Sequence, residues 1–375
     1  MTLLLTRADV ADLLSMEACI EAVEHAFRLH GEGRADPPGI LSVHATDGGF
    51  HIKAGILELG RPYFAAKTNA NFPANPARFG LPTIQGVLLL ADAERGTPLA
   101  LMDSAEITAI RTGAATAVAA RHLARADATV VTVCGCGRQG REQLRALATV
   151  RPLTRAYAFD QDPARAIRFA EEMSSALGID VRVAEDLDLA FHASDICVTC
   201  TPSRKPILRQ GAVGAGTFIA AVGADNESKQ ELEAALMAAS VVVVDMLEQA
   251  ATIGDLHHAI ACGALTPGDV RAELGQVIAG RRPGRQSDDE IVIFDSTGVA
   301  LEDVAAAAAA YERAVRAGRG LQVDLAASRS EAARDPVSPL RGRRSPRSTS
   351  PPTLPRRWRR ALRSRLSRSR RPVIV

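Results

Sequence analysis

The chain has 375 residues, a formal net charge of +2 and 47% hydrophobic residues, values typical of a globular protein with room for two domains. No run of about 18 apolar residues predicts a membrane span, and no secretory signal is apparent, so we expect a cytoplasmic protein. Residues 328–375 contain fifteen arginines against two acidic residues, a net charge of +13, so residues 1–327 carry −11 and give no support to nucleic-acid binding.

The first hundred residues predict a helix followed by strands. The segment that begins at Ser15 has apolar residues at helical spacing, with Ser15 as a cap and Gly31 at its end. After it, short apolar runs broken by turn residues predict β-strands. These strands fall at residues 40–45, 49–57, 63–70, 83–92 and 98–103. The sequence therefore predicts an α+β fold for this part of the chain.

From residue 105 the pattern changes to strands that alternate with helices. Residues 105–124 are helical by composition and periodicity, and a last helix over 302–318 is expected to return to the first domain. Between them, unbroken β-branched runs indicate strands of a buried parallel sheet. The runs lie at 129–135, 155–160, 195–200, 217–223, 241–245 and 291–297. The sequence thus predicts an α/β fold with a Rossmann-type doubly wound sheet.

Residues 326–375 form a segment rich in Arg, Ser and Pro. We expect it to be a disordered tail without catalytic function, because it lacks apolar periodicity. One alternative is an arm that binds nucleic acid or an anionic membrane. Another is translation of an Arg-rich coding sequence in a shifted reading frame.

The stretch VVTVCGCGRQG contains the spacing of a dinucleotide-binding turn. Gly135, Gly137 and Gly140 follow a predicted strand and open a predicted helix, and Asp160 ends the next strand twenty residues after Gly140. The helix N-terminus would stabilise a pyrophosphate. Asp160 would accept hydrogen bonds from the ribose hydroxyls and repel a 2′-phosphate, which favours NAD. NADP is not excluded, because Arg138 and Arg165 are close in sequence.

The six cysteines do not suggest a disulfide framework or a metal site. Cys197 and Cys200 form a CxxC, but both lie at a predicted buried strand, where cysteine acts as a small hydrophobe. The segment CTPSRKP follows that strand. Thr201 and Pro202 would either line the binding site of the adenosine part of a dinucleotide or belong to an ordinary turn.

Asp225 directly follows the apolar run 217–223 in GADNESKQEL. At the start of a helix, which we expect here, an aspartate is usually an N-cap. At the carboxyl end of a strand in a parallel sheet, the same aspartate lies at the edge where ligands bind. The two roles are compatible, so Asp225 is a candidate for both.

Five ordered segments resemble the ornithine cyclodeaminase/mu-crystallin family over residues 1–322. They are KTNANFPANPARFGLPTIQGVLLL, LMDSAEITAIRTGAATAVAARHLA, CGCGRQG, GTFIAAVGADNESKQEL and GRQSDDEIVIFDSTGVALEDVAAA. The resemblance implies an NAD(P)-binding Rossmann domain over 111–299. It also implies a discontinuous substrate-binding and dimerisation domain over 1–110 and 300–325, and hence a homodimer. Family members include cyclodeaminases, alanine dehydrogenases and reductases of imino acids.

The resemblance also implies roles for individual residues. Lys67 and Arg111 match the cationic pair that holds the substrate carboxylate, and Asp225 matches the acid/base aspartate. Other positions match or flank those that line the dinucleotide site. They are Thr83, Arg111, Thr112, Gly135, Gly137, Arg138, Gln139, Gly140, Asp160, Thr201, Val222, Gly223, Lys229 and Ser296.

One strand departs from the family pattern. Where cyclodeaminases carry a glutamate that pairs with the distal ammonium of ornithine, this chain has His51 and Lys53, which share one face of a strand. We take both as candidate substrate-binding residues of a pocket suited to a neutral or acidic amino acid. We therefore expect net oxidoreduction of a small amino or imino acid. Conversion of ornithine to proline and ammonia is the first alternative, and a non-catalytic NAD(P)H-binding protein is the second.

Overall fold

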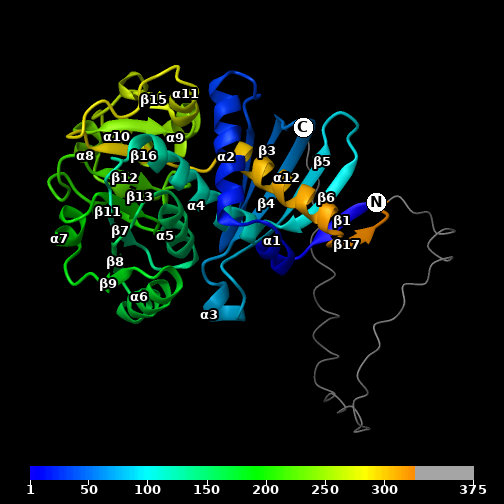
Figure 1. Cartoon of the computed structure of the whole chain (residues 1–375), viewed down its shortest axis with the longest axis horizontal. Coiled ribbons are helices and arrows are strands. Elements are labelled where there is room, and N and C mark those ends of the chain that lie inside the picture. The colour runs from blue at the N-terminus through cyan, green and yellow to red at the C-terminus, as the bar shows by residue number, and fades with distance from the viewer. Residues whose placement is uncertain (326–375) are drawn as a thin grey trace, which may run out of the picture. The chain divides into compact units, whose positions relative to one another are not determined.

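Two β-sheets organise residues 1–325, the part of the chain that the computed structural model describes (Figure 1). The tail expected over residues 326–375 lies outside the described residues. One sheet has seven strands, in the order β17-β1-β6-β5-β4-β3-β2. Its strands are β1 (Thr2–Leu5), β2 (Gly39–Ala45), β3 (Gly48–Glu58), β4 (Pro62–Asn71), β5 (Ile84–Asp92), β6 (Pro98–Asp103) and β17 (Leu321–Val323). All five strands predicted between residues 40 and 103 are present, while the short strands β1 and β17 were not predicted.

The two faces of this sheet differ in what covers them. Helices α4 (Ser104–Leu123) and α12 (Ala300–Ala317) pack on one face, and α2 (Met16–Gly31) packs on those helices. Side chains of β2 to β5 alternate, so every second residue points to the other face. That outer face is apolar and exposed. It includes Leu41, Val43, Phe50, Ile56 and Val87, which are 40–57% exposed.

Helix α2 forms where its sequence predicts it. The side chain of Ser15 accepts a hydrogen bond from the N–H of Ala18, and the helix ends at Gly31. Its buried face includes Ile20, Val23 and Phe27, the apolar residues at helical spacing. Two shorter helices, α1 (Arg7–Leu13) and α3 (Asn75–Phe79), complete this half of the chain.

The second sheet has eight strands, and every strand pair in it is parallel. The order is β15-β14-β16-β12-β10-β7-β8-β9. The strands are β7 (Val130–Cys134), β8 (Arg155–Phe159), β9 (Asp180–Val183), β10 (Ile196–Thr199), β12 (Phe218–Ala221), β14 (Val241–Val244), β15 (Ala272–Glu273) and β16 (Val292–Asp295). Strand β7 has β8 on one side and β10 on the other, so the order reverses there. A ligand crevice is expected outside the carboxyl ends of strands at such a reversal.

Helices cover both faces of this sheet, which confirms the predicted doubly wound, Rossmann-type fold. Along β16, Val292 and Phe294 belong to the hydrophobic cluster on one face and Ile293 to the cluster on the other. The helices are α5 (Arg138–Val150), α6 (Pro163–Leu177), α7 (Leu187–His192), α8 (Ala234–Ala238), α9 (Leu247–Ile253), α10 (Asp255–Ala261), α11 (Leu274–Ile278) and the 3₁₀ turn η1 (Pro267–Asp269). No helix within residues 1–325 has both the length and the apolar character that a bilayer span requires.

The helix expected to start at Asp225 is absent, and that prediction is wrong. Residue 226 forms a bend and residues 227–228 a turn, and β13 (Gln230–Leu232) pairs with β11 (Arg204–Leu208) in a small parallel sheet. The side chain of Asn226 accepts hydrogen bonds from the N–H and the hydroxyl of Ser228. Such a local side-chain bond competes with helix formation. Asp225 is therefore not an N-cap.

Helix α4 links the two halves of the molecule. It packs against β5 of the seven-stranded sheet and against β12 and β16 of the parallel sheet. Small residues let it approach its neighbours closely: a Cβ at Gly113 would lie 2.7 Å from the carbonyl oxygen of Glu142 on α5. The domain boundary predicted between residues 110 and 111 falls within this continuous helix.

Candidate active site

The glycine turn after β7 has the geometry of an anion-binding loop. Gly135 has a φ of +108°, and a Cβ there would lie 2.7 Å from the carbonyl oxygen of Cys200. Gly137 precedes the first turn of α5 without a side-chain cap, and no atom lies within 4 Å of the place its Cβ would occupy. The N–H groups at the start of α5 are thus free to bind an anion.

Asp160 stands beside this turn, at the end of β8. Its carboxylate accepts hydrogen bonds from the N–H groups of Cys136 and Asp162, both at 3.0 Å. Arg165 Nη1 lies 3.7 Å from the Asp160 carboxylate. The predicted ribose-binding carboxylate is therefore held against the glycine turn, with a cation close by.

A cavity of about 570 Å³ opens between the carboxyl edge of the parallel sheet and the helix-covered face of the other sheet. It brings together most of the predicted site residues. They are His51, Lys53, Lys67, Thr83, Arg111, Thr112, Gln139, Thr201, Val222, Gly223, Asp225, Lys229 and Ser296. The other predicted residues do not line it. They are Gly135, Gly137, Arg138, Gly140 and Asp160, which belong to the glycine turn and its flanks.

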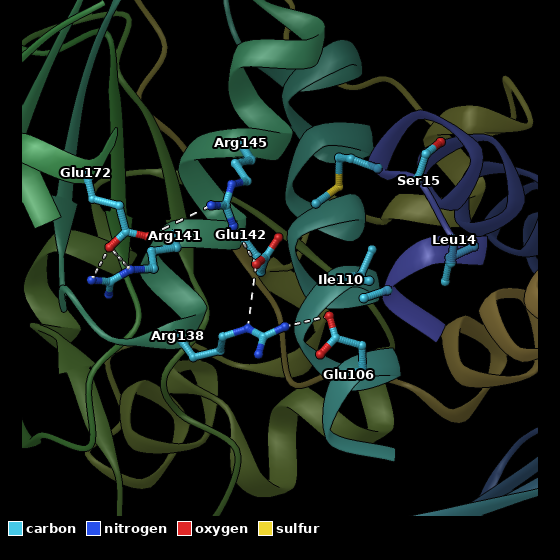
Figure 2. Close-up of a pocket in the computed structure, with 11 residues that line it drawn as sticks. Leu14, Ser15, Glu106, Ile110, Arg138, Arg141, Glu142, Arg145 and Glu172 are labelled. Atoms are coloured by element: carbon cyan, nitrogen blue, oxygen red, sulfur yellow. Dashed lines mark hydrogen bonds and ion pairs between the residues drawn. The ribbon is translucent and has the colours of Figure 1, made fainter. Parts of the chain in front are cut away.

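Arg138 lines a second cavity, of about 450 Å³ (Figure 2). Its guanidinium contacts the carboxylates of Glu106 at 2.6 Å and Glu142 at 3.6 Å. Arg141 and Arg145 in the same cavity are also paired with glutamates. The charge of Arg138 is thus engaged by protein carboxylates rather than directed into the larger cavity.

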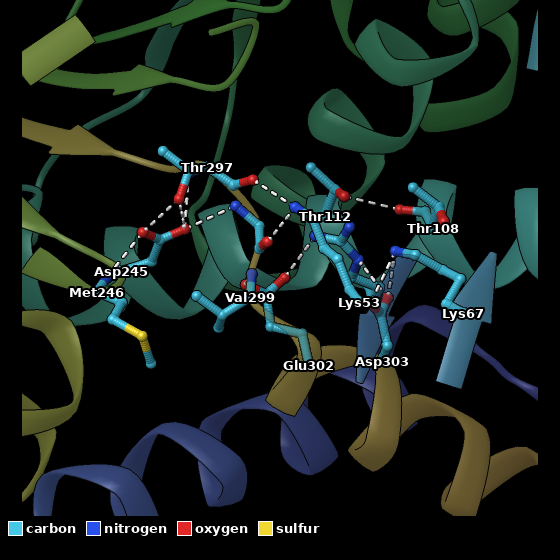
Figure 3. Close-up of polar contacts among 12 residues, drawn as sticks. Lys53, Lys67, Thr108, Thr112, Asp245, Met246, Thr297, Val299, Glu302 and Asp303 are labelled. Carbon is cyan, nitrogen blue, oxygen red and sulfur yellow. Dashed lines mark hydrogen bonds and ion pairs between the residues drawn. The ribbon is translucent and has the colours of Figure 1, made fainter. Parts of the chain in front are cut away.

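Lys67 and Arg111 share a buried carboxylate (Figure 3). Lys67 Nζ lies 2.8 Å from Asp303 Oδ1, and Arg111 Nε lies 2.9 Å from the same oxygen. Arg111 Nη1 also contacts Glu302 Oε2 at 2.8 Å. Burial, together with the charge of Arg111, lowers the pKa of Lys67 to about 7, although Asp303 opposes that shift. Asp303 and Glu302 therefore fix the predicted cationic pair in place.

Lys53 is held in a different way. Its ammonium donates to the carbonyl oxygens of Thr297 at 3.1 Å and Gly298 at 2.6 Å. The buried carboxylate of Asp245 holds that loop by accepting from the N–H groups of Thr297 and Gly298, both at 2.7 Å (Figure 3). A Cβ at Gly298 would lie 2.6 Å from Arg111 Nη1, so a glycine is required there.

Asp225 enters the cavity from the loop after β12. Lys229 Nζ donates to its Oδ1 at 2.7 Å, and the Asp225 side chain remains 49% exposed. Burial by itself would raise the pKa of Asp225, but the ammonium of Lys229 outweighs burial, so the pKa is lowered. Asp225 is thus an ionised carboxylate in contact with the cavity.

Glu231 joins two loops of the cavity wall. One carboxylate oxygen accepts from the N–H of Thr201 at 2.6 Å and from its hydroxyl at 2.7 Å. The other accepts from the N–H of Gly223 at 2.8 Å. Burial, and then the charge of Asp255, raise the pKa of Glu231 to about 7. Thr201 thereby has a structural partner as well as its place on the cavity wall.

Three buried polar atoms of the cavity have no hydrogen-bond partner within the described chain, and one of them is Asn71 Oδ1 on β4. The other two are Gln139 Nε2, at the start of α5, and Ser296 Oγ, which directly follows β16. Buried polar groups are usually satisfied, so such orphans indicate where a bound polar molecule would make contact. Together with the open glycine turn, they fit a dinucleotide that runs from α5 into the cavity.

The family model for ornithine cyclodeaminase/mu-crystallin proteins matches residues 1–318. The chain belongs to the ornithine cyclodeaminase/mu-crystallin family. An archaeal alanine dehydrogenase dimer with bound NAD is 39% identical, with a TM-score of 0.83 over 86% of this chain and 99% of that one. Delta(1)-pyrroline-2-carboxylate reductase of Thermococcus litoralis, in complex with NADH and L-proline, is 37% identical, with a TM-score of 0.82 over 86% and 100%. Iminosuccinate reductase of Paracoccus denitrificans is 33% identical over 86% of this chain and 100% of its own.

Membership of this family confirms the resemblance stated from the sequence, but sequence reasoning missed several groups of the site. Four buried acids fix residues that line the cavity, and the sequence did not predict these contacts. They are Asp245, Glu231, Glu302 and Asp303. The two adjacent acids at 302 and 303, in the segment STGVALED, were a signal in the sequence for such partners. Asn69, Thr108, Cys200, Arg204 and Thr297 also line the cavity.

Proposed function

We propose that this protein is an NAD-dependent enzyme that transfers a hydride at the α carbon of a small amino or imino acid, with net oxidoreduction. The observation that carries the proposal is the cavity, in which the carboxylate of Asp225 and the cations Lys53, Lys67 and Arg111 line one space. That space lies at the carboxyl edge of the parallel sheet, where dinucleotides bind in doubly wound folds. The similar alanine dehydrogenase and the two reductases support the same reaction class.

Residues of the glycine turn would hold the cofactor. The N–H groups after Gly137 would bind the pyrophosphate, and Asp160 would accept from the ribose hydroxyls, which supports NAD over NADP. The amide nitrogen of Gln139 and the hydroxyl of Ser296, which have no partner within the described chain, would form hydrogen bonds with the cofactor. Bound NAD supplies the hydride acceptor, and NADH the hydride donor.

The chain's own residues position the substrate and move its proton. Lys67 and Arg111, fixed by Asp303, would bind the α-carboxylate with their remaining N–H donors and so orient the α carbon. Asp225, ionised and exposed to the cavity, would exchange a proton with the substrate nitrogen. Lys229 would keep Asp225 in position.

We also propose a homodimer formed through the outer face of the seven-stranded sheet. An exposed apolar sheet face of this kind is typical of a protein interface. Leu41, Val43, Phe50 and Ile56 lie on it, and the similar alanine dehydrogenase is a dimer. In this arrangement residues 1–110 and 300–325 bind substrate and dimerise, while residues 111–299 bind NAD. We place the enzyme in the cytoplasm, where its six free cysteines would stay reduced.

A substrate panel tests the proposal on the full-length protein. Amino acids with NAD, and cyclic imines or 2-oxoacids plus ammonia with NADH, would be followed by absorbance of NADH. Steady NADH formation or loss with one of these substrates is the expected result. Proline and ammonia from ornithine with trace NAD and no net NADH change would instead establish cyclodeamination. NADH binding without any turnover would establish a binding protein.

A further inference from the structure

Lys53 is a cavity lysine that no carboxylate contacts among the described residues. The chain has four lysines, and three of them line this cavity. Lys67 is paired with Asp303 and Lys229 with Asp225. Lys53 instead donates to the carbonyl oxygens of Thr297 and Gly298 (Figure 3). The direct hydrogen-bond partners of its ammonium are therefore neutral carbonyl groups at the wall of the cavity.

An anionic ligand would complete the hydrogen bonding of Lys53. Burial lowers the pKa of Lys53, and the charge of Arg111 adds to that effect. An ammonium has three N–H donors, and the two carbonyl contacts use two of them. The third N–H is available to a ligand carboxylate, which would make a charge-assisted hydrogen bond.

His51 adds a second donor on the same side of the strand. It lies two residues before Lys53 on β3, so both side chains point to the cavity face of the sheet. The hydroxyl of Ser42 contacts His51 Nδ1 at 3.2 Å. The other ring nitrogen, Nε2, is then the one left for a ligand.

The side chains around the cavity favour an anionic ligand. Five basic side chains line it: Lys53, Lys67, Arg111, Arg204 and Lys229. Three carboxylates line it or pair with those cations: Asp225, Glu302 and Asp303. The basic side chains thus outnumber the carboxylates, and Lys53 is the lysine of the cavity without a carboxylate contact among the described residues.

We propose that Lys53 and His51 form a second carboxylate-binding subsite, so that the substrate is a short dicarboxylic amino acid or its imine. This inference rests on the proposed function. Lys67 and Arg111 would hold the α-carboxylate, and Lys53 would hold the side-chain carboxylate. In the reductive direction the imine carbon gains a hydride, the nitrogen gains a proton, and NADH is oxidised to NAD.

Matched substrates test the subsite directly. L-Aspartate and L-asparagine have nearly the same shape and differ in one negative charge. Oxaloacetate plus ammonia and pyruvate plus ammonia form the corresponding pair for reduction. We expect kcat/KM for the dicarboxylic member of each pair to exceed that of its partner by about 10- to 100-fold. Equal values for both members, or a preference for the monocarboxylic one, would overturn the proposal.

The variant Lys53→Met tests whether Lys53 causes the preference for dicarboxylic substrates. Methionine matches the apolar stem of lysine and lacks its ammonium, so the charge and the N–H donors are removed together. We expect kcat/KM for aspartate to fall about 10- to 100-fold, while the value for asparagine changes less than about threefold. An equal loss for both substrates would show that Lys53 serves the α-carboxylate instead. Lys205→Met, at an exposed lysine of β11 outside the cavity, is the matched control and should leave both values unchanged.

Binding of an unreactive dicarboxylate separates this inference from the proposed function. Succinate and butyrate would be titrated against the protein saturated with NADH, by calorimetry. Tighter binding of succinate, lost in Lys53→Met but kept in Lys205→Met, would support the subsite even if no substrate were turned over. Equal binding of succinate and butyrate by the wild-type protein would refute the subsite, whatever the outcome for turnover.

Discussion

The carboxylate of Glu231 binds the backbone N–H of Gly223 at 2.8 Å, and the same side chain holds Thr201. Gly223 follows β12 and Thr201 follows β10, so one buried side chain sets the spacing of two loops that line the cavity. Asp225 lies two residues beyond Gly223. The position of the proposed acid/base group thus depends on the carboxylate of Glu231, whose contacts with Gly223 and Thr201 were not predicted from the sequence.

Glu231 should make stability depend on pH in a defined direction. Its pKa is raised from an ordinary 4.5 to about 7, so between these values the folded protein binds more protons than the unfolded chain. The free energy of unfolding therefore falls as pH rises through this window and levels off above it. Relative to Glu231→Gln, which has no such titration, the wild type should lose up to about 3 kcal/mol between pH 4 and pH 8.

Urea unfolding of both proteins across that pH range measures the difference. Because other buried acids titrate in both proteins, only the difference between the two curves reports on Glu231. Parallel curves would mean that Glu231 is ionised throughout and that its pKa is not raised.

Asp225→Asn should remove turnover and spare cofactor binding. The amide has nearly the same shape but takes up no proton, so kcat is expected to fall on the order of 10²- to 10⁴-fold. The dissociation constant for NADH, measured by fluorescence, should stay within about threefold, since Asp225 does not belong to the glycine turn. Glu227→Gln, at an exposed acid two residues away, is the control. Retained activity in Asp225→Asn would remove Asp225 from the mechanism.

Gly137→Ala should weaken NADH binding without changing stability. No protein atom lies within 4 Å of the position of the new Cβ, and the φ of Gly137 is −82°, so the fold tolerates a methyl group. The methyl would occupy the approach of the pyrophosphate, and we expect the dissociation constant to rise by about tenfold or more. Gly268→Ala, at another uncrowded glycine, should change neither quantity. Unchanged NADH affinity in Gly137→Ala would place the pyrophosphate elsewhere.

Phe50→Glu should dissociate the proposed dimer. Phe50 is 40% exposed on the outer face of the seven-stranded sheet, and a carboxylate there would be desolvated in an interface. The dimer dissociation constant, measured by sedimentation, should rise by about 30-fold or more. Leu189→Glu changes an apolar residue on α7 that is 69% exposed, and it should have no effect. A dimer that survives Phe50→Glu would lie on another surface.

Much of the fold was predictable because its signals are local. The parallel strands are continuous apolar runs, and the glycine spacing sits between a strand and a helix, so short windows of sequence are enough. The prediction of a helix after Gly223 was wrong for a local reason as well. There the side chain of Asn226 binds the backbone of Ser228, a turn interaction that residue composition alone did not separate from a helix start.

By itself the sequence determined the parallel sheet, the family, and the identity of Lys67, Arg111 and Asp225 as candidates, since motifs preserve residue type and order. Only the tertiary structure decided which charges are paired. Asp303 lies more than two hundred residues from Lys67, yet their side chains are 2.8 Å apart, while Lys53 meets only backbone carbonyls. The physical reason is that burial makes each unpaired charge unfavourable, and whether a charge is paired depends on helix packing across both sheets, which no short stretch of sequence contains.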